Sequence, residues 1–513
     1  MSSSRPPIWY PNNPKFQSYS KVMAKITADD LYDGLVGYGL FSDIIPPLFT
    51  SEGLLNFFKT KPKQALNKLG WNYIFYESAR NNGEFRPLGI PNPFGYEDLC
   101  RFLADKWPLL QQHFKQYTHK NYHKISRLHI RKLKGTKSLF KMSYSPWQID
   151  ENPAPDMKIG ARYMVLADIS NCFPSMYTHA LSWALYTKPI AKQEQNNPKW
   201  WPNTLDKKVR RLKDGETHGL LIGPHSSNLL SEIILVVIDQ HLSDNNFKFI
   251  RNIDDYECYV ESYEEGERFH NQLREELRKF DLALNLKKCK ILELPLESDD
   301  LWVNQLSNAS FLNQKNKWTY HEVRVYLDLA VELLKKNNGN ASILYYAMKV
   351  IASKKLSKSA NLYVQKIFFH LAVIYPYLIQ HLSTYVFDPL KVPPRVIRAW
   401  VNYQLPHQLE QKNYEAVSFM IYFAIKYKFN INTFKVSSAI NQPDCILKTI
   451  SLIYFKNNKN ASAQGKLKKH AIELQGTRDD LESNWLFVFE ALEASMLQQD
   501  WKTLKKAGVT FFR

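Results

Sequence analysis

Two separate stretches of this chain each read as a β-strand that carries an aspartate at its end. Residues 163–167 form a continuous apolar run, typical of a strand covered on both faces, and Asp168 follows it. Residues 247–260 contain alternating β-branched and aromatic positions on both sides of Asp254 and Asp255, which indicates a β-hairpin with carboxylates at its turn. A fold that satisfies both patterns delivers three carboxylates to the ends of strands.

The context of the pair matters, because two adjacent aspartates alone carry little information. The chain has three other such pairs: Asp29-Asp30, Asp299-Asp300 and Asp479-Asp480. These follow helical or polar stretches and are more simply explained as residues at helix starts or in solvated loops.

Carboxylates that converge from separate elements suit divalent-metal chemistry. Two metal ions roughly 3.5 to 4 Å apart need several hard oxygen ligands, so that one ion activates an attacking 3′-hydroxyl and the other stabilises a leaving pyrophosphate. We therefore expect Asp168, Asp254 and Asp255 to be catalytic residues and ligands of Mg²⁺ or Mn²⁺. The alternative is a strand-end aspartate and a hairpin with ordinary turn chemistry.

The segments around these aspartates have a definite order. Residues 81–91 combine a tight turn with an arginine and an extended segment, and residues 219–238 read as a Gly-Pro turn that leads into a core-facing helix. Downstream, residues 269–280 have the apolar spacing of a helix, and residues 284–292 read as a strand with basic residues.

This order of parts resembles the reverse-transcriptase family between about residues 50 and 300. The resemblance matches five family motifs to this chain: the fingers motif to 86–91, two palm motifs to 168–173 and 219–234, the catalytic tetrapeptide to 252–255, and the lysine-bearing motif to 284–290. Residues 168–179 and 223–232 are more similar still to the bacterial abortive-infection and defence-associated reverse transcriptases, the AbiK-like group.

The resemblance implies roles for single residues. It implies that Arg86, Phe173, Gly223 and Lys287 bind the nucleotide, and that the backbone of Ile169 joins the metal ligands. The guanidinium of Arg86 suits bidentate phosphate binding. The ring of Phe173 matches a steric gate that excludes a 2′-hydroxyl, which implies deoxynucleoside triphosphates as substrate.

Each of these roles has an alternative in ordinary structure. Arg86 reads equally as a surface arginine beside a turn, and Phe173 as a strand-end aromatic in the core. Lys287, Lys288 and Lys290 are alternatives for neutralising the departing pyrophosphate, and a basic strand edge that faces solvent explains all three as well.

Two positions depart from the family pattern. Asn252 stands where the catalytic tetrapeptide usually begins with an aromatic residue, and Ile222 stands where a glutamine often precedes the glycine of the second palm motif. The family residues help to seat the primer end or the templating base. The resemblance to the AbiK-like group therefore implies DNA synthesis that is primed by a protein side chain and proceeds without a conventional template.

The charge of the chain favours a polyanionic partner. The formal net charge is +19 and the isoelectric point is about 9.4. Residues 115–141 contain nine Lys or Arg, three His and no acidic residue, with aromatic residues between them. In this segment we expect nucleic-acid-binding residues, with a solvated basic helix as the alternative: Lys124, Arg127, Arg131, Lys132 and Lys134.

Nothing in the sequence favours secretion or a membrane partner. The first residues lack an apolar core behind their charge, so we expect no signal peptide. The apolar run 367–379 is interrupted and too short to span a bilayer. Five cysteines without a Cys-x-x-Cys pair indicate reduced thiols in a cytoplasmic protein, with no zinc site.

The character of the chain changes near residue 300. We expect an α+β fold, with the fingers and palm of a right-hand polymerase in residues 1–305 and an all-α, helical-repeat-like domain in residues 306–513. The expected helices of the second part are 318–336, 341–356, 360–386, 394–404, 414–428, 445–456 and 484–506. The resemblance to the AbiK-like group implies that HEAT-like repeats replace a thumb here and mediate assembly into a homo-oligomer.

The expected function is a DNA polymerase of the reverse-transcriptase family in bacterial antiphage defence, protein-primed and independent of a conventional template. One alternative is an RNA-templated reverse transcriptase that copies a dedicated noncoding RNA or a mobile-element RNA. A second alternative is an inactive scaffold that binds nucleic acid. The expected partners are nucleic acid, with DNA as the product and a noncoding RNA as a further candidate, and further copies of the chain.

Overall fold

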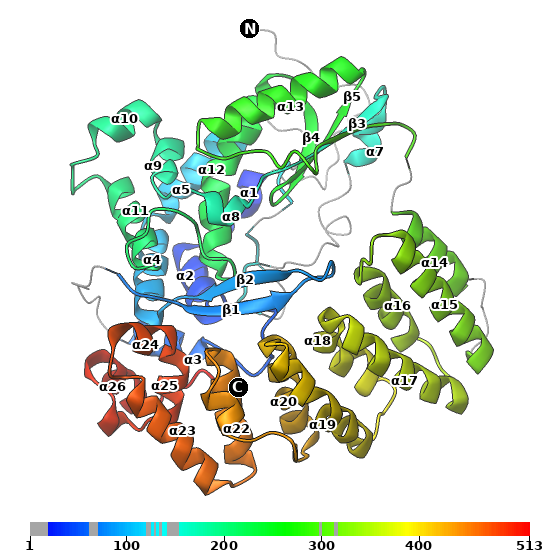
Figure 1. Cartoon of the computed structure of the whole chain (residues 1–513). Helices are drawn as coiled ribbons and strands as arrows, with labels where there is room; N and C mark the ends of the chain where they lie inside the picture. Colours follow the sequence, from blue (N-terminus) through cyan, green and yellow to red (C-terminus); the bar gives the residue numbers. More distant parts are fainter. Residues whose placement is uncertain are drawn as a thin grey trace.

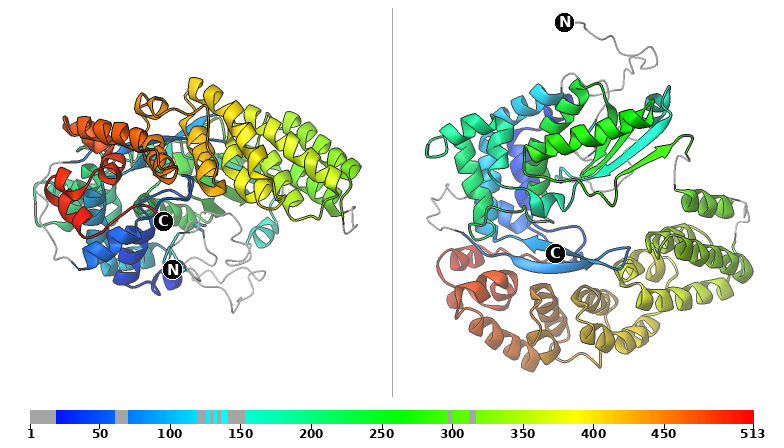
Figure 2. Two further views of the ribbon diagram at one scale, coloured as in Figure 1. Left: turned by 90° about the horizontal axis from the view of Figure 1, so that it is seen from below. Right: turned by 45° about the horizontal axis from the view of Figure 1, so that its top comes forward.

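The computed structural model describes residues 19–60, 70–118, 125–127, 130–132, 136–140, 153–296, 300–311 and 317–513. Figure 1 shows a mixed region of helices and small sheets, with an arc of helices on one side of it. A hairpin of β1 (Ile74–Ala79) and β2 (Phe85–Ile90) lies between the two parts, as the right view of Figure 2 also shows. The expected fold class, an α+β region followed by an all-helical region, is confirmed.

A four-stranded antiparallel sheet, the central sheet, has the strand order β4-β5-β3-β6. Its strands are β3 (Tyr163–Asp168), β4 (Lys248–Asn252), β5 (Asp255–Val260) and β6 (Lys290–Glu293). Strands β4 and β5 form the expected hairpin, with Asn252 opposite Asp255 across a two-residue turn. Strand β3 pairs with β5 in a register that places Asp168 opposite Asp255. Strand pairing alone therefore brings the end of β3 to the hairpin turn.

Two helices support this sheet. Helix α13 (Tyr263–Arg278) packs on β3 and β5. A Cβ added to Gly266 would meet side-chain atoms of Ile291 and Val165 at 3.0 and 3.2 Å, so this glycine lets the helix approach the strands closely. Helix α12 (His225–Asp244) is buried along most of its length and packs against α13. The central sheet and α12 together support the β4–β5 hairpin.

Further helices complete the mixed region. They are α1 (Tyr19–Met23), α2 (Ala28–Tyr38), α3 (Glu52–Lys59), α4 (Pro93–Asp105), α5 (Trp107–Thr118), α7 (Ala154–Lys158), α8 (Cys172–Ser175), α9 (Ala180–Leu185), α10 (Lys188–Gln193) and α11 (Trp201–Arg211). Asp29 and Asp30 lie in the first turn of α2, where Asp30 forms a capping box with Thr27, so their prediction as helix-start residues is confirmed.

The helices from α14 onwards, which we call the helical region, follow one another along the arc in Figure 1. They are α14 (Leu301–Phe311), α15 (Tyr320–Lys336), α16 (Ser342–Ala352), α17 (Lys358–Ile374), η1 (Pro376–Leu378), α18 (Ile379–Leu382), η2 (Ser383–Phe387), α19 (Pro394–Glu410), α20 (Tyr414–Tyr427), α21 (Ser437–Ile440), α22 (Cys445–Asn457), α23 (Ala461–Glu473), α24 (Arg478–Ser483), α25 (Trp485–Ala491), η3 (Ala494–Met496) and α26 (Gln499–Lys506). Helix α14 packs on α15 and α16, so the helical region begins before the expected boundary at residues 305 and 306.

The structure corrects several expected helices. The continuous helix expected over 360–386 ends at Ile374, because Pro376 lacks an amide hydrogen and disfavours helical backbone at the residue before it. The helix expected over 484–506 is broken between α25 and α26. Helix α19 continues past the expected end at residue 404 and accommodates Pro406. Three helices were not predicted from the sequence, because they have few apolar positions: α21, α23 and α24.

Residues 284–292 also differ from the expected strand. The chain turns at residues 286–288, and β6 begins only at Lys290. The amide of Asn285 donates to the carbonyl of Asp168 at 2.8 Å, and the amide of Lys288 donates to the carbonyl of Asn285 at 3.0 Å, which closes the turn. The turn therefore lies directly beside the end of β3.

Two further findings concern the chain as a whole. All five cysteines are free, and four of them are buried. Across the residues that the structure describes, no helix combines the length and the apolar character needed to cross a membrane.

Candidate active site

The structure places Asp168, Asp254 and Asp255 together at one end of the central sheet. Asp168 ends β3 and lies opposite Asp255, which begins β5. The amide of Ile169 donates to the carbonyl of Asp254 at 3.1 Å and ties the end of β3 to the hairpin turn. Asp168 is buried and Asp254 partly buried, whereas Asp255 is exposed. The three acidic residues therefore meet at an edge that solvent reaches.

The pKa values of Asp254 and Asp255 are both raised. The protein atoms around Asp255 remove part of its hydration, and together with the neighbouring Asp168 and Asp254 carboxylates this raises the pKa of Asp255 to about 7. Burial and the charge on Asp168 raise the pKa of Asp254, and the positive charges of Lys288 and Arg86 offset only part of this rise. Such a concentration of negative charge attracts a cation.

A lysine already occupies part of this field. Nζ of Lys288 lies 2.5 Å from Oδ2 of Asp168. Partial burial alone would lower the pKa of Lys288, but the hydrogen bond to Asp168 and the charges of the three carboxylates raise it. The predicted residue Lys287 is exposed and lies in the same turn. The structure thus brings Lys288, rather than Lys287, into contact with the acidic group.

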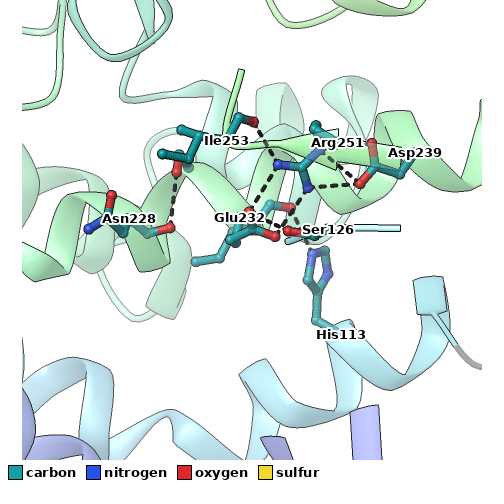
Figure 3. Close-up of polar contacts among 9 residues, drawn as sticks. His113, Ser126, Asn228, Glu232, Asp239, Arg251 and Ile253 are labelled. Carbon is teal, nitrogen blue, oxygen red and sulfur yellow. Dashed lines mark hydrogen bonds and ion pairs between the residues drawn. The ribbon is translucent and has the colours of Figure 1, made fainter. Parts of the chain in front are cut away.

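The hairpin turn has an unusual backbone. Ile253, its first residue, has a φ of 61°, a left-handed conformation that β-branched residues rarely adopt. Glycine usually fills this position in two-residue hairpin turns with one left-handed residue. Nη1 of Arg251 donates to the carbonyl of Ile253 at 2.8 Å (Figure 3). Hydrogen bonds from Arg251 and Ile169 therefore hold the two successive carbonyls of the turn.

Arg251 belongs to a fully buried cluster of charged side chains (Figure 3). Its Nε and Nη2 donate to the Asp239 carboxylate at 2.8 to 3.0 Å, and its Nη1 and Nη2 donate to the Glu232 carboxylate at 3.0 and 3.1 Å. Glu232 also accepts a hydrogen bond from Oγ of Ser126 at 3.1 Å. The guanidinium thus joins the hairpin to two carboxylates of α12.

Sequence reasoning missed this cluster, although a signal for it exists. Arg251 shares the alternation of the core residue Phe249, so its position in the strand predicts burial. A buried arginine requires acidic partners. Glu232 and Asp239 are seven residues apart on one helix, which places them on the same face. Together these features predict a link between the hairpin and α12.

Strand β2 carries Arg86, which acts on Asp254, and it also contacts the loop that contains Gly223. The positive charge of Arg86 lowers the pKa of Asp254, but burial and the charge of Asp168 raise it by more. The amide of Gly89 donates to the carbonyl of Ile222 at 2.9 Å. Gly223 has a φ of 125°, and an added Cβ would lie 3.4 Å from the carbonyl oxygen of Gly89. The loop before α12 therefore lies directly against β2.

Phe173 lies in α8 close behind the end of β3. Its side chain is partly buried and packs against the core, and its carbonyl accepts a hydrogen bond from the amide of Leu220 at 2.8 Å. A ring with one face on the core and part of its area exposed fits both the gate and the core interpretation of this residue.

The basic segment is only partly described. Two of its five predicted residues lie outside the described residues: Lys124 and Lys134. Lys132 forms an ion pair with Asp30 of α2, with 2.6 Å between Nζ and Oδ2. The amide of Arg127 donates to the carbonyl of Arg251 at 2.8 Å, and the amide of Arg131 donates to the carbonyl of Leu139 at 3.1 Å. The described part of this segment is therefore held against α2 and the β4–β5 hairpin.

The acidic residues fit a divalent cation in their chemistry. Within the described ranges, no group of three or more His, Cys, Asp or Glu side chains has the arrangement of a preformed metal cluster. Asp168, Asp254 and Asp255 are hard oxygen donors, however, and the charge of their neighbours raises the pKa of two of them. The contact of Asp168 with the Lys288 ammonium shows that a cation is accommodated there.

A comparison with protein families matches the part of the chain that carries this arrangement. Residues 80–323 match the family model described as reverse transcriptase (RNA-dependent DNA polymerase). This range contains β2, the whole central sheet and the three aspartates. A comparison with curated proteins gave no match.

Similar solved structures include three telomerases. Apo telomerase from Candida tropicalis is 10% identical, with a TM-score of 0.31, and the match covers 85% of this chain and 76% of that one. The same telomerase truncated from its C-terminal domain is 13% identical, with a TM-score of 0.27, covering 49% of this chain and 55% of that one. Telomerase from Candida albicans in complex with a TWJ fragment of telomeric RNA is 9% identical, with a TM-score of 0.27, covering 80% and 67%.

Telomerase similarity at this level does not extend to function. The chain spans 55% of the length of the truncated telomerase. What identifies the domain is the family match, which covers the strands that carry Asp168, Asp254 and Asp255. Residues 80–323 are a reverse-transcriptase domain, the nucleotidyltransferase domain of RNA-dependent DNA polymerases.

Proposed function

We propose that this chain adds deoxynucleotides to a 3′-hydroxyl in a reaction that depends on Mg²⁺ or Mn²⁺. The observation that carries the proposal is the meeting of Asp168, Asp254 and Asp255 at the end of the central sheet, with Lys288 on Asp168. A basic chain of formal net charge +19 suits a nucleic-acid substrate.

The three aspartates would hold the divalent ions, together with the backbone carbonyl of Ile169. When bound, such ions activate the attacking hydroxyl and stabilise the leaving pyrophosphate. The carboxylates have to lose their protons first, which applies above all to Asp255, because its pKa is raised to about 7.

The neighbouring residues would bind the nucleotide. Arg86 offers a bidentate donor to the triphosphate, and Gly223 leaves room for a close approach to the backbone beside β2. Lys288, and Lys287 in the same turn, offer positive charge to the departing pyrophosphate. Phe173 would lie against the sugar and exclude ribonucleotides.

A primer-extension assay tests this proposal. Purified protein is incubated with labelled deoxynucleoside triphosphates and Mg²⁺, with and without a chelator, and Asp168→Asn is assayed beside it. We expect incorporation only with the metal and only with the intact aspartate. Metal-independent incorporation, or an active Asp168→Asn variant, would contradict the assignment.

We further propose that synthesis is primed by a protein side chain, needs no conventional template and acts in antiphage defence. The support is the similarity of residues 168–179 and 223–232 to the AbiK-like group, together with the departure from the family pattern at Asn252 and Ile222. Asn252 pairs with Asp255 across the turn, and the carbonyl of Ile222 is bonded to Gly89. Asn252 thus lies beside the acidic group, and Ile222 lies against the strand that carries Arg86.

Incubation with single deoxynucleotides after nuclease treatment separates this mode from the alternatives. Product attached to protein, without added RNA, supports protein priming. Strict dependence on added RNA supports copying of a noncoding RNA or a mobile-element RNA. If no nucleotide is incorporated under any of these conditions, the remaining alternative is an inactive scaffold that binds nucleic acid.

The remaining predictions rest on the sequence alone. They are binding of nucleic acid by the basic segment, assembly into a homo-oligomer through the helical region, and a place in the cytoplasm. Light scattering of the purified chain tests assembly directly.

A further inference from the structure

The helical region contacts the β1–β2 hairpin through hydrogen bonds to β1. Next to the start of β1, the carboxylate of Glu482 accepts a hydrogen bond from the amide of Asn72 at 2.7 Å. At the end of β1, Glu415 accepts hydrogen bonds from Oγ of Ser78 at 2.6 Å and from the amide of Ala79 at 2.7 Å. Two acidic side chains from distant parts of the chain thus hold one short strand.

Glu415 is a costly residue to bury. It is the second residue of α20 and only 4% exposed. A buried carboxylate without partners is strongly unfavourable, and both oxygens of Glu415 are satisfied by donors of β1. The contact therefore has a defined geometry, unlike an apolar contact that tolerates sliding.

The strand register connects this contact to the candidate site. Ser78 lies directly opposite Arg86 in the β1–β2 pair, and Ala79 lies opposite Phe85. On the other side of the hairpin, β2 is bonded to the loop before α12 through Gly89. Strand β1 is thus fastened to the helical region and β2 to the loop of the reverse-transcriptase domain.

A second contact holds the turn of the hairpin. The carbonyl of Asn81 accepts a hydrogen bond from the amide of Ala341 at 2.8 Å. Its Nδ2 donates to Oδ1 of Asn340 at 2.8 Å and to Oγ of Ser342 at 2.9 Å. Figures 1 and 2 show the hairpin lying between the arc and the central sheet. A two-stranded hairpin is only marginally stable alone, so these contacts decide where its end lies.

We propose that Glu415 is a positioning residue, which holds the β1 backbone opposite Arg86 and so places Arg86 for the incoming triphosphate. The proposal rests on the proposed nucleotidyl transfer. It gives the helical region a part in the nucleotide site through the backbone of β1. Loss of the contact should weaken nucleotide binding more than the chemical step, because the metal-binding aspartates lie on other strands.

Steady-state incorporation by Glu415→Ala and Glu415→Gln tests this proposal. For Glu415→Ala we expect the KM for deoxynucleotides to rise about tenfold with a smaller change in kcat, since Arg86 is displaced while the aspartates stay in place. Glu415→Gln should behave like the wild type, because its amide still accepts from Ala79 and can donate to the Ser78 hydroxyl. Glu332→Ala, at an exposed carboxylate of α15, is the matched control.

Hydrogen exchange of residues 74–79 gives a readout that needs no activity. Faster exchange in Glu415→Ala, but not in Glu415→Gln, is expected from the lost contact. Asn81→Ala provides a second variant that leaves no buried charge, with a KM increase of about threefold expected. Its smaller effect keeps the test available if Glu415→Ala does not fold.

The outcomes are distinguishable. A wild-type protein that incorporates no nucleotide overturns the proposed function. Unchanged exchange of β1 in Glu415→Ala overturns the contact itself. Faster exchange with an unchanged KM, or equal impairment of Glu415→Ala and Glu415→Gln, overturns the positioning role.

Discussion

Replacing Arg251 by methionine removes the cation from a cluster that also contains two carboxylates. The side chains of Arg251, Glu232 and Asp239 are 0%, 1% and 5% exposed, so neither carboxylate can turn towards water. Breaking a buried ion pair by removing one partner costs about 3 to 5 kcal/mol, because the remaining charge is left uncompensated. Here two carboxylates lose the same cation, and we expect the free energy of opening the β4–β5 hairpin to fall by about 4 to 5 kcal/mol.

The pH dependence of this loss follows from the carboxylates. Burial raises the pKa of Asp239 even while Arg251 is present. Without the guanidinium, the buried Asp239 carboxylate holds its proton more tightly in the folded state than in the unfolded state. Stability then falls as the pH rises, since the folded state binds more protons. Arg251→Met should therefore be more strongly destabilised at pH 8 than at pH 5.

Native-state hydrogen exchange of the β4 and β5 amides measures this free energy of opening locally. Combining Arg251→Met with Glu232→Gln and Asp239→Asn should recover much of the stability, because no buried charge remains. Nucleotide incorporation should stay low in the combined variant, since the Ile253 carbonyl still lacks the Arg251 donor.

Arg274→Met, at an exposed position of α13, is the control for losing an arginine. A loss below about 1 kcal/mol in Arg251→Met would refute the account of the cluster, because that is the range of exposed ion pairs. A combined variant no more stable than Arg251→Met would refute it as well.

Two further predictions concern the nucleotide and metal sites. Phe173→Ala should raise incorporation of ribonucleotides relative to deoxynucleotides by about tenfold or more in a competition assay, and an unchanged ratio would show that the ring is a core residue only. The raised pKa of Asp255, about 7 against an ordinary 3.8, means that a cation must displace a proton below that pH. Apparent Mg²⁺ affinity, measured by titration calorimetry, should therefore rise by up to about tenfold per pH unit below pH 7 and level off above it, and Asp255→Asn should remove part of this slope.

The positions of the three aspartates were predictable because strand patterns are local. The apolar run before Asp168 and the alternation around Asp254 and Asp255 each specify a strand and its end. Antiparallel pairing then leaves few arrangements in which the two strand ends do not meet. The period of side-chain character thus predicts the two strand ends, and the pairing of β3 with β5 brings them together.

Features that depend on the turn after a strand were not predictable in the same way. Residues 284–292 have the composition of a strand, yet the chain turns before Lys290. The turn forms because the amide of Asn285 bonds to the carbonyl of Asp168, a residue far away in sequence. A pattern of single residues contains no information on that bond. The resemblance implied Lys287, and the residue pattern could not distinguish it from Lys288, which the turn brings to Asp168.

Contacts between elements that are far apart in the sequence were also not predictable. Glu415 begins an ordinary helix in the sequence, and its partners lie more than three hundred residues earlier. The partial signal for Arg251 was the presence of a charged residue at a core position of a strand. Glu415 carries no such signal, because a carboxylate in the first turn of a helix is explained by the helix dipole alone.

The central claim, that the acidic group catalyses nucleotide addition, is tested most directly by one paired comparison. Asp254→Asn with Asp255→Asn is assayed for labelled deoxynucleotide incorporation in Mg²⁺ beside Asp479→Asn with Asp480→Asn, an exposed pair at the start of α24. Both double variants remove the same charge, and hydrogen exchange checks that both remain folded. We predict no measurable incorporation by the first variant and wild-type incorporation by the second. Incorporation by a folded Asp254→Asn, Asp255→Asn protein would contradict the account.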